Sequence, residues 1–438
     1  MKTLYVYKFL PVVILLLVFN PLRSKAYSVL THEAVVDASW KKSIVPLLKE
    51  RFPMATDSEL RVAHSYAYGG CMMPDMGYFP FGAVYFTDLA HYVRTGDFVS
   101  ALLTESQNLN ELAFSLGALC HYMADKYGHS LGTNHVVPTV YPKLKAQYGD
   151  VVTYEENPIA HSRVEISFDV LQIARGNYAS PEYHDFIGFN VDTAVLQRAF
   201  VKTYGQDIND VFGDFPLAVG TFRWSVRSLL PTLTRAAWAL RKSDIRKTNP
   251  SANSRSFHYN MRRRDYYAEF GNKYKRPGFK AQVLAFLIRI LPKVGPLKAF
   301  KFKDPGPEGE KLFIASFDSV LVHYGDALAE LRHKRVITLA NVDYDTGKPT
   351  TLGEYGLADK TYDQLVQKLK DNKFFDMSHP LKQNILSFYN TADTAKLAQK
   401  DSSDWKKTYM ALQGVKKAPP VRIDSLKTSK GVNYKLLR

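Results

Sequence analysis

The chain contains little cysteine, no internal repeat and no glycine-rich phosphate loop. Its only two cysteines in 438 residues, Cys71 and Cys120, exclude a disulfide-dense scaffold and a four-cysteine zinc ribbon, and leave a single bridge open. Hydrophobic residues make up 46% of the chain and aromatic residues 13%, which excludes the disordered and fibrous classes. The sequence therefore predicts a folded globular protein.

Acidic residues are outnumbered by basic ones. Lys and Arg together number 58 against 42 Asp and Glu, which gives a formal net charge of +16. A charge of this sign favours anionic partners such as phospholipid surfaces, nucleic acid or phosphorylated substrates. The charge alone does not choose among these partners.

Residues 1–26 have the features of a secretory signal peptide: basic residues, the apolar run Phe9–Phe19, and the small-residue pattern Ser24–Ala26. Cleavage would make Tyr27 the first residue of the mature chain and would remove four basic residues and no acidic one, leaving 16 minus 4, or +12. We therefore expect an exported protein, located in the periplasm, at the cell surface or outside the cell.

Amphipathic periodicity predicts an all-α, multi-helix bundle in residues 27–245. Glycine and proline gather between the expected helices, as at Gly69-Gly70. The expected helices are Glu33–Leu48, Asp57–Tyr68, Ala83–Arg94, Asn108–Lys126, Ser162–Ala174, Thr193–Tyr204 and Ala218–Leu240.

Three further regions follow the predicted bundle. Residues 246–310 are predicted to be a basic insert or linker that contains the apolar stretch Val283–Leu291. Within it, residues 262–303 form either a peripheral membrane contact or a core helix with solvated flanks. Residues 311–332 are expected to return to the bundle as a helix. Residues 333–438 are expected to form a small mixed appendage with a basic tail. Its predicted elements are a strand at Val336–Asn341, a tight turn at Asp345–Gly347 and a helix at Lys360–Leu369.

Metal-ligand side chains recur at helical spacing. His121, Asp125 and His129 lie four residues apart, so they share one stripe of a helix, and His161 and Glu165 repeat the spacing on another. The first stripe adjoins an apolar sequence, where buried Asp and His would be costly unless a metal satisfied them. Two histidines with one carboxylate are typical of zinc sites that keep a position open for water.

The sequence resembles the zinc-dependent phospholipase C family, whose trinuclear-zinc, all-α fold is shared with the fungal single-strand nucleases. Its local sequence is similar to that of the catalytic domain of glycosylphosphatidylinositol-specific phospholipase D. The resemblance extends from Tyr27 to Glu165. The segments that carry it are Thr31-His32-Glu33, Gly70-Cys71-Met72-Met73-Pro74-Asp75 with Tyr78-Phe79-Pro80, His91, the run His121–Gly132, and His161 with Glu165.

The resemblance implies three zinc ions, with two as the minimum. Asp75 is implied to be the catalytic residue that helps to deprotonate a zinc-bound water while remaining a ligand. The third ion would use the amino group and carbonyl of Tyr27, where the family usually has Trp. The implied ligand sets are Asp75, His91, His121 and Asp125 for the first ion; His129, His161 and Glu165 for the second; and His32, the far oxygen of Asp125 and Tyr27 for the third.

Three other polar residues lie near these positions. His135 competes with His129 for the same role, but a loop histidine is the favoured interpretation. His64 is interpreted as a helix-surface or packing residue. Asp88 lies one helical turn before His91 and is either an orienting partner for that ring or a solvent-facing carboxylate.

The favoured function is a secreted phospholipase C that hydrolyses membrane phospholipids through a zinc-bound hydroxide. One alternative is a nuclease-type phosphodiesterase on single-stranded nucleic acid, which the spacing from Tyr27 to His32 and the basic charge also suit. The other is a zinc-stabilised lipid-binding protein with little catalysis.

Overall fold

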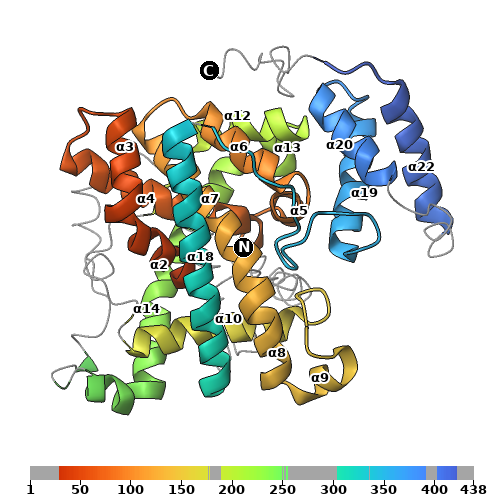
Figure 1. Cartoon of the computed structure of the whole chain (residues 1–438). Helices are drawn as coiled ribbons and strands as arrows, with labels where there is room; N and C mark the ends of the chain where they lie inside the picture. The colour runs from red at the N-terminus through yellow and green to blue at the C-terminus, as the bar shows by residue number, and fades with distance from the viewer. Residues whose placement is uncertain are drawn as a thin grey trace, which may run out of the picture.

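The computed structural model describes residues 29–175, 177, 189–248, 250, 253, 254, 303–334, 336–390 and 402–421. These residues form a helical bundle (Figure 1), as the periodicity predicts. The α-helices are α2 (Val29–Ser39), α3 (Val45–Arg51), α4 (Asp57–Met72), α5 (Val84–Tyr92), α6 (Thr95–Glu105), α7 (Leu109–Gly128), α8 (Asn134–Val140), α9 (Pro142–Tyr148), α10 (Pro158–Arg175), α12 (Thr193–Tyr204), α13 (Ile208–Val211), α14 (Phe215–Thr248), α18 (Gly306–Lys334), α19 (Gly356–Asp371), α20 (His379–Asn390) and α22 (Ser402–Lys417). Two π-helical turns, η1 (Trp40–Ile44) and η3 (His129–Thr133), and the 3-10 helix η2 (Met73–Tyr78) connect some of them.

Helix α7 lies in the core of the bundle and packs against α2, α4, α6 and α18. It begins where the side chain of Asn108 accepts hydrogen bonds from the backbone N–H groups of Asn110 and Glu111, which satisfies two donors of the first turn. Its C-terminal end continues directly into η3. This rigid helix therefore carries His121 and Asp125 into the interior of the molecule.

Helix α4 is longer than the sequence predicts. The expected end at Tyr68, before Gly69-Gly70, is wrong, because α4 continues to Met72. A Cβ atom on Gly70 would lie 1.9 Å from the carbonyl oxygen of Phe114 on α7. These glycines therefore allow close packing between backbones instead of breaking the helix.

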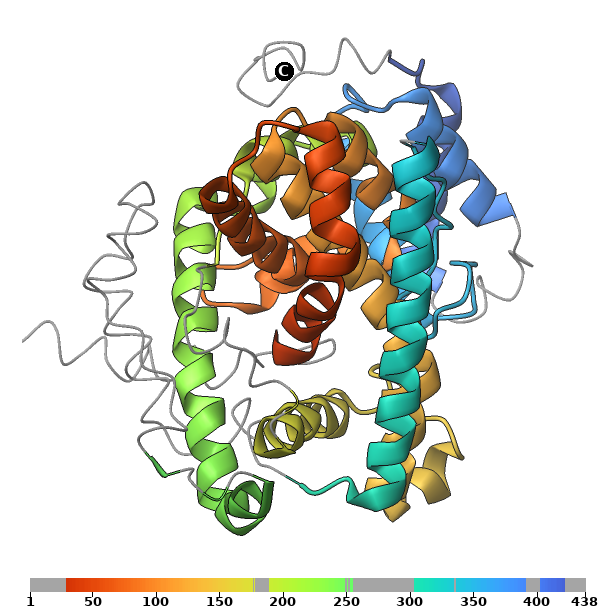
Figure 2. The same cartoon turned by 60° about the vertical axis from the view of Figure 1, so that its left-hand side comes forward.

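The long helices α14 and α18 flank opposite sides of the bundle in the view of Figure 2, with the red helices of the N-terminal part between them. Among the described residues, α18 is the helix whose length and composition would suffice to cross a membrane. One face of α18 packs on α7, where the hydroxyl of Tyr324 donates to the carbonyl oxygen of Leu116 at 2.9 Å. Phe313, Val320 and Leu328 on this helix are also buried.

The C-terminal part of the described chain is helical, with α19, α20 and α22 grouped at one side of the molecule (Figure 1). The predicted strand at Val336–Asn341 is wrong, and only isolated bridges, Val342 with Pro349 and Ser378 with Val421, occur in the described residues. The segment that follows pairs with helix ends instead of with a strand. The hydroxyl of Thr95 donates to the carbonyl oxygen of Val342 and accepts from its N–H.

Several expectations lie outside the described residues: the signal peptide 1–26, Tyr27, residues 262–302 with the apolar stretch Val283–Leu291, and the tail after residue 421. Both cysteines are described, and both are buried and free. The bridge that the sequence leaves open is therefore absent.

Candidate metal centre

The predicted ligand residues come from six parts of the fold and converge in its interior. His32 comes from α2, Asp75 from η2, His91 from α5, His121 and Asp125 from α7, His129 from the junction of α7 and η3, and His161 and Glu165 from α10. All eight side chains are buried. The ninth predicted ligand, Tyr27, lies outside the described residues.

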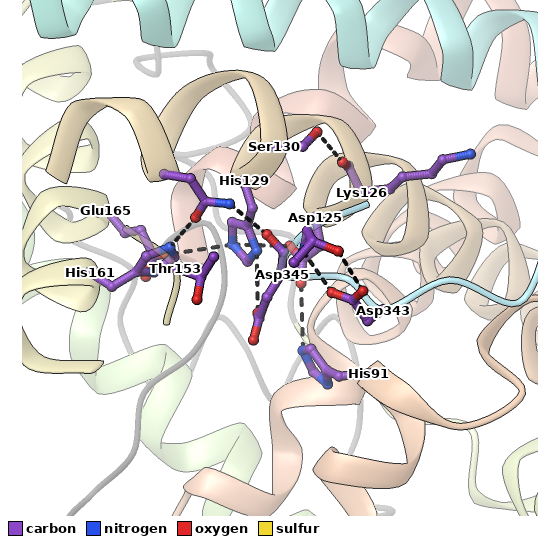
Figure 3. Close-up of polar contacts among 12 residues, drawn as sticks. His91, Asp125, Lys126, His129, Ser130, Thr153, His161, Glu165, Asp343 and Asp345 are labelled. Atoms are coloured by element: carbon purple, nitrogen blue, oxygen red, sulfur yellow. Dashed lines mark hydrogen bonds and ion pairs between the residues drawn. The ribbon is translucent and has the colours of Figure 1, made fainter. Parts of the chain in front are cut away.

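Asp125 stands at the centre of this cluster, and its two oxygens face different histidines (Figure 3). Oδ2 lies 3.1 Å from Nε2 of His121 and 3.5 Å from Nε2 of His91. Oδ1 lies 3.3 Å from Nε2 of His32 and 4.0 Å from Nε2 of His129. This arrangement is that of a carboxylate able to bridge neighbouring cations.

The remaining carboxylates extend the cluster to either side. Oδ1 of Asp75 lies 3.4 Å from Nε2 of His91. Oε1 of Glu165 lies 3.3 Å from Nε2 of His129 and 2.8 Å from Nδ1 of His161. Three sets of ligand atoms lie within 4.8 Å of one another: His32, His121 and Asp125; Asp75, His91 and His121; and His129, His161 and Glu165.

Three of the histidines are oriented by hydrogen bonds from their outer nitrogens. Nδ1 of His91 donates to the carbonyl oxygen of Thr87 at 2.8 Å, and Nδ1 of His121 donates to that of Cys71, also at 2.8 Å. Nε2 of His161 donates to Oδ1 of Asn134 at 2.9 Å. Such bonds fix the tautomer and leave the inner nitrogen lone pair available to a metal.

The orienting partner of His91 is thus a backbone carbonyl, that of Thr87, and not the carboxylate of Asp88. Thr87 lies four residues before His91 on α5, so its carbonyl is the natural acceptor on that face of the helix. Asp88 is half-buried on the same helix.

The charges of the cluster depend strongly on one another. Burial opposes ionisation of Asp125, but His121 and His129 outweigh this effect and hold its pKa well below the usual range. Burial would lower the pKa of His91, but the carboxylates of Asp125 and Asp75 raise it to about 9. The protein alone therefore stabilises an anionic carboxylate at the centre, which is the ionisation state that a cation requires.

The donor set fits zinc. Buried ligand atoms that make no hydrogen bond include Oδ1 of Asp75, Nε2 of His91 and of His121, both oxygens of Asp125, Nδ1 of His161 and Oε1 of Glu165. Burying such atoms without compensation is costly, and a divalent cation would satisfy several at once. Imidazole nitrogens combined with carboxylate oxygens are ligands that zinc accepts.

Sequence reasoning missed a carboxylate from the C-terminal region. Asp345 is fully buried, and its Oδ1 lies 3.6 Å from Nδ1 of His129 (Figure 3). The ring of Tyr344 beside it lies near His91 and His121, with centroids 5.2 and 5.7 Å apart. The tight turn at Asp345–Gly347 was the available signal, but nothing in its spacing connects it to residues more than 200 positions earlier.

The other candidate histidines lie elsewhere. His64 is buried, stacks on Trp40 with ring centroids 3.8 Å apart, and has Nε2 2.8 Å from Oδ1 of Asp37. Of the two interpretations of His64, helix-surface residue and packing residue, the structure supports the second. His135 is half-buried on α8, so its interpretation as a loop histidine is wrong, but it belongs to none of the three sets of ligand atoms.

Residues 31–214 match the family model described as zinc dependent phospholipase C. These residues are thus similar to the zinc-dependent phospholipase C family, and the resemblance stated from the sequence is confirmed. The match supports a zinc-dependent hydrolase of the phospholipase C type. No curated protein and no solved structure matches the chain.

Proposed function

We propose that the protein is an exported, zinc-dependent phospholipase C that hydrolyses membrane phospholipids. The observation that carries this proposal is the convergence of two histidines on each oxygen of Asp125, a carboxylate buried between two further acidic ligands. The family match over residues 31–214 supports the same chemistry.

The proposed ligand sets follow from this geometry and from the resemblance. Asp125 would serve two of these sets, because its two oxygens face separate nitrogens. The first ion is assigned to Asp75, His91, His121 and Asp125; the second to His129, His161 and Glu165; and the third to His32, Asp125 and the amino group and carbonyl of Tyr27.

When bound, zinc would polarise the phosphate ester and lower the pKa of a water molecule. Asp75 is the group assigned to take up the proton of the attacking water, since Oδ1 of this carboxylate makes no hydrogen bond within the protein. Thr87, Cys71 and Asn134 hold the imidazole rings of their partner histidines in place through the acceptors described above. Burial of the surrounding side chains limits access of bulk water and strengthens these electrostatic interactions.

Export is proposed from the sequence of residues 1–26. It is tied to the chemistry, because the α-amino group of Tyr27 can bind a metal only after a cleavage has freed it. The basic charge of +12 that remains after cleavage, 16 minus 4, suits an anionic membrane surface. Peripheral membrane contact through residues 262–303 is part of the same proposal.

The test is a parallel assay of the mature protein on phosphatidylcholine vesicles and on single-stranded DNA, with and without a chelator. Release of diacylglycerol that stops with chelation and returns with zinc is the expected result. Release of nucleotides instead would identify a nuclease-type phosphodiesterase. Vesicle binding without either product would identify a zinc-stabilised lipid-binding protein. The Asp125→Ala variant is the negative control, because any hydrolysis in its preparation comes from a contaminating enzyme.

A further inference from the structure

One of the histidines in the metal centre has an outer nitrogen that faces a carboxylate. The corresponding nitrogens of His91, His121 and His161 are held by neutral oxygens, two of them backbone carbonyls and one an amide. Nδ1 of His129 instead faces Oδ1 of Asp345 at 3.6 Å, an ion-pair distance, while Nε2 of the same ring points toward Glu165.

The carboxylate of Asp345 is itself held firmly. Its Oδ2 accepts hydrogen bonds from the hydroxyl of Tyr92 at 2.7 Å and from that of Tyr355 at 2.5 Å. Its backbone carbonyl accepts from Nδ2 of Asn134 at 2.6 Å, and Oδ1 of the same amide holds His161. The side chain of Asp345 therefore faces His129 directly, and its backbone holds Asn134, the partner of His161.

The turn that carries Asp345 is built into the wall of the centre. The N–H of Tyr344 donates to the carbonyl oxygen of His91 at 3.1 Å. Gly347 has a φ of +72°, and a Cβ atom there would lie 2.6 Å from the carbonyl oxygen of Lys126 on α7. The turn thus packs against two of the elements that supply ligands, and Asp345 has little freedom to move.

We propose that Asp345 is a positioning residue of the metal centre, which orients His129 and increases the basicity of its Nε2. A carboxylate on the outer nitrogen of a ligand histidine fixes the tautomer and favours cation binding at the inner nitrogen. This inference rests on the proposed zinc site. It assigns a function in that site to the C-terminal region, since Asp345 lies outside the family match at residues 31–214.

The test measures zinc affinity by competition with a chromogenic chelator in the full chain. Losing a partner of this kind lowers metal affinity by roughly 10- to 100-fold. We expect Asp345→Ala to show this loss for the ion assigned to His129, His161 and Glu165, and Asp345→Asn to show a smaller one, because the amide keeps the contact with the ring but not the negative charge. Tyr355→Phe, which removes one of the two hydroxyl donors to Asp345, should have the smallest effect.

The matched control is Asp343→Asn, in the same turn. Asp343 is also buried, but its carboxylate accepts from the N–H and hydroxyl of Thr346 and not from a ligand histidine. We expect this variant to keep the zinc affinity of the unmodified protein. Thermal unfolding of each variant in its zinc-free form reports how far the turn itself is disturbed.

Each outcome separates the two proposals. If the unmodified protein binds no zinc, the proposed function fails. If it binds zinc and the Asp345 variants bind it equally well, the positioning role of Asp345 is wrong. Equal losses in the Asp343 and Asp345 variants, accompanied by equal destabilisation of the zinc-free protein, would also overturn it, because they would reduce Asp345 to a structural residue of the turn.

Discussion

Asp125 is the residue on which the ligand atoms meet. Its two oxygens face four histidines from four different parts of the fold. Removing this side chain leaves several buried nitrogens without their shared counter-charge. The effect should therefore exceed the loss of a single ligand.

We predict that Asp125→Ala abolishes hydrolysis and lowers the zinc content by more than one ion per chain. Elemental analysis of dialysed protein and the vesicle assay measure the two effects. His135→Ala is the matched control, because this histidine lies outside the three ligand sets, and it should be almost silent. Full activity of Asp125→Ala would exclude a bridging role, and a loss in His135→Ala equal to that in His129→Ala would show that His135 is the ligand.

Asp343 gives a prediction about pH. Burial raises the pKa of this carboxyl to about 6, although the hydrogen bonds from Thr346 act to lower it. Because the folded pKa lies above the unfolded value, stability from the protonated form is complete below the unfolded pKa, near 4, and is lost as pH rises through about 6. For each pKa unit by which the folded value exceeds the unfolded value, the free energy of unfolding falls by about 1.4 kcal/mol once the pH has passed the folded pKa.

We therefore expect Asp343→Asn to gain stability relative to the unmodified protein between pH 4 and pH 7. Urea unfolding of both proteins at several pH values gives the free energies of unfolding to compare. A difference that stays constant across this range would mean that Asp343 titrates normally in the folded protein.

At the scale of elements, the close contact between α4 and α7 positions ligand residues of the metal centre. Cys71 on α4 orients His121 on α7 through its carbonyl oxygen, so the two helices must stay close enough to keep this hydrogen bond of 2.8 Å. Gly70 on α4 and Gly117 on α7 make this approach possible.

We predict that Gly70→Ala destabilises the fold by at least about 2 kcal/mol, because the added Cβ would lie 1.9 Å from the carbonyl oxygen of Phe114. Gly325→Ala on α18 is the control. A Cβ there meets nothing within 4 Å, so alanine should be neutral or stabilise the helix by about 0.5–1 kcal/mol. Thermal or denaturant unfolding measures both. Equal stability of the two variants would contradict the packing argument.

The same contact shows what the sequence could and could not predict about the elements. The periodicity of Leu109–Gly128 and the four-residue spacing of His121, Asp125 and His129 identify a buried helix and its ligand stripe, because both are local properties. The end of α4 was mispredicted, because Gly69-Gly70 looks the same whether it breaks a helix or admits a neighbour. Only the position of Phe114 distinguishes the two cases.

At the scale of the whole molecule, the centre is closed by a segment remote in sequence. Asp345 and Tyr344 reach His129 and His91 from the region that joins α18 to α19. Their contribution could not be predicted, because it depends on where the chain returns after α18 and not on any repeat or spacing. The strand predicted at Val336–Asn341 failed for the same reason, since the carbonyl oxygen of Ala340 accepts from the hydroxyl of Tyr122 on α7 and not from a neighbouring strand.

The number of bound ions is a property of the whole folded molecule. It can be measured from the way the free energy of unfolding depends on the free zinc concentration. A ligand that binds only the folded state stabilises it by about 1.4 kcal/mol for each tenfold rise in free concentration and each bound ion, once the sites are saturated. In zinc buffers, the free energy of unfolding of a chain that begins at Tyr27 should therefore rise by about 4.1 kcal/mol per tenfold for three ions and about 2.7 for two.

A chain with one residue added before Tyr27 is the matched comparison, because its α-amino group is displaced from the proposed third site. We expect its slope to fall from the three-ion to the two-ion value, while the ligand sets around His91 and His129 still bind zinc. Identical two-ion slopes would remove Tyr27 from the centre. A slope near zero in both chains would mean that the buried histidines and carboxylates around Asp125 hold no zinc, and the proposed chemistry would fail with them.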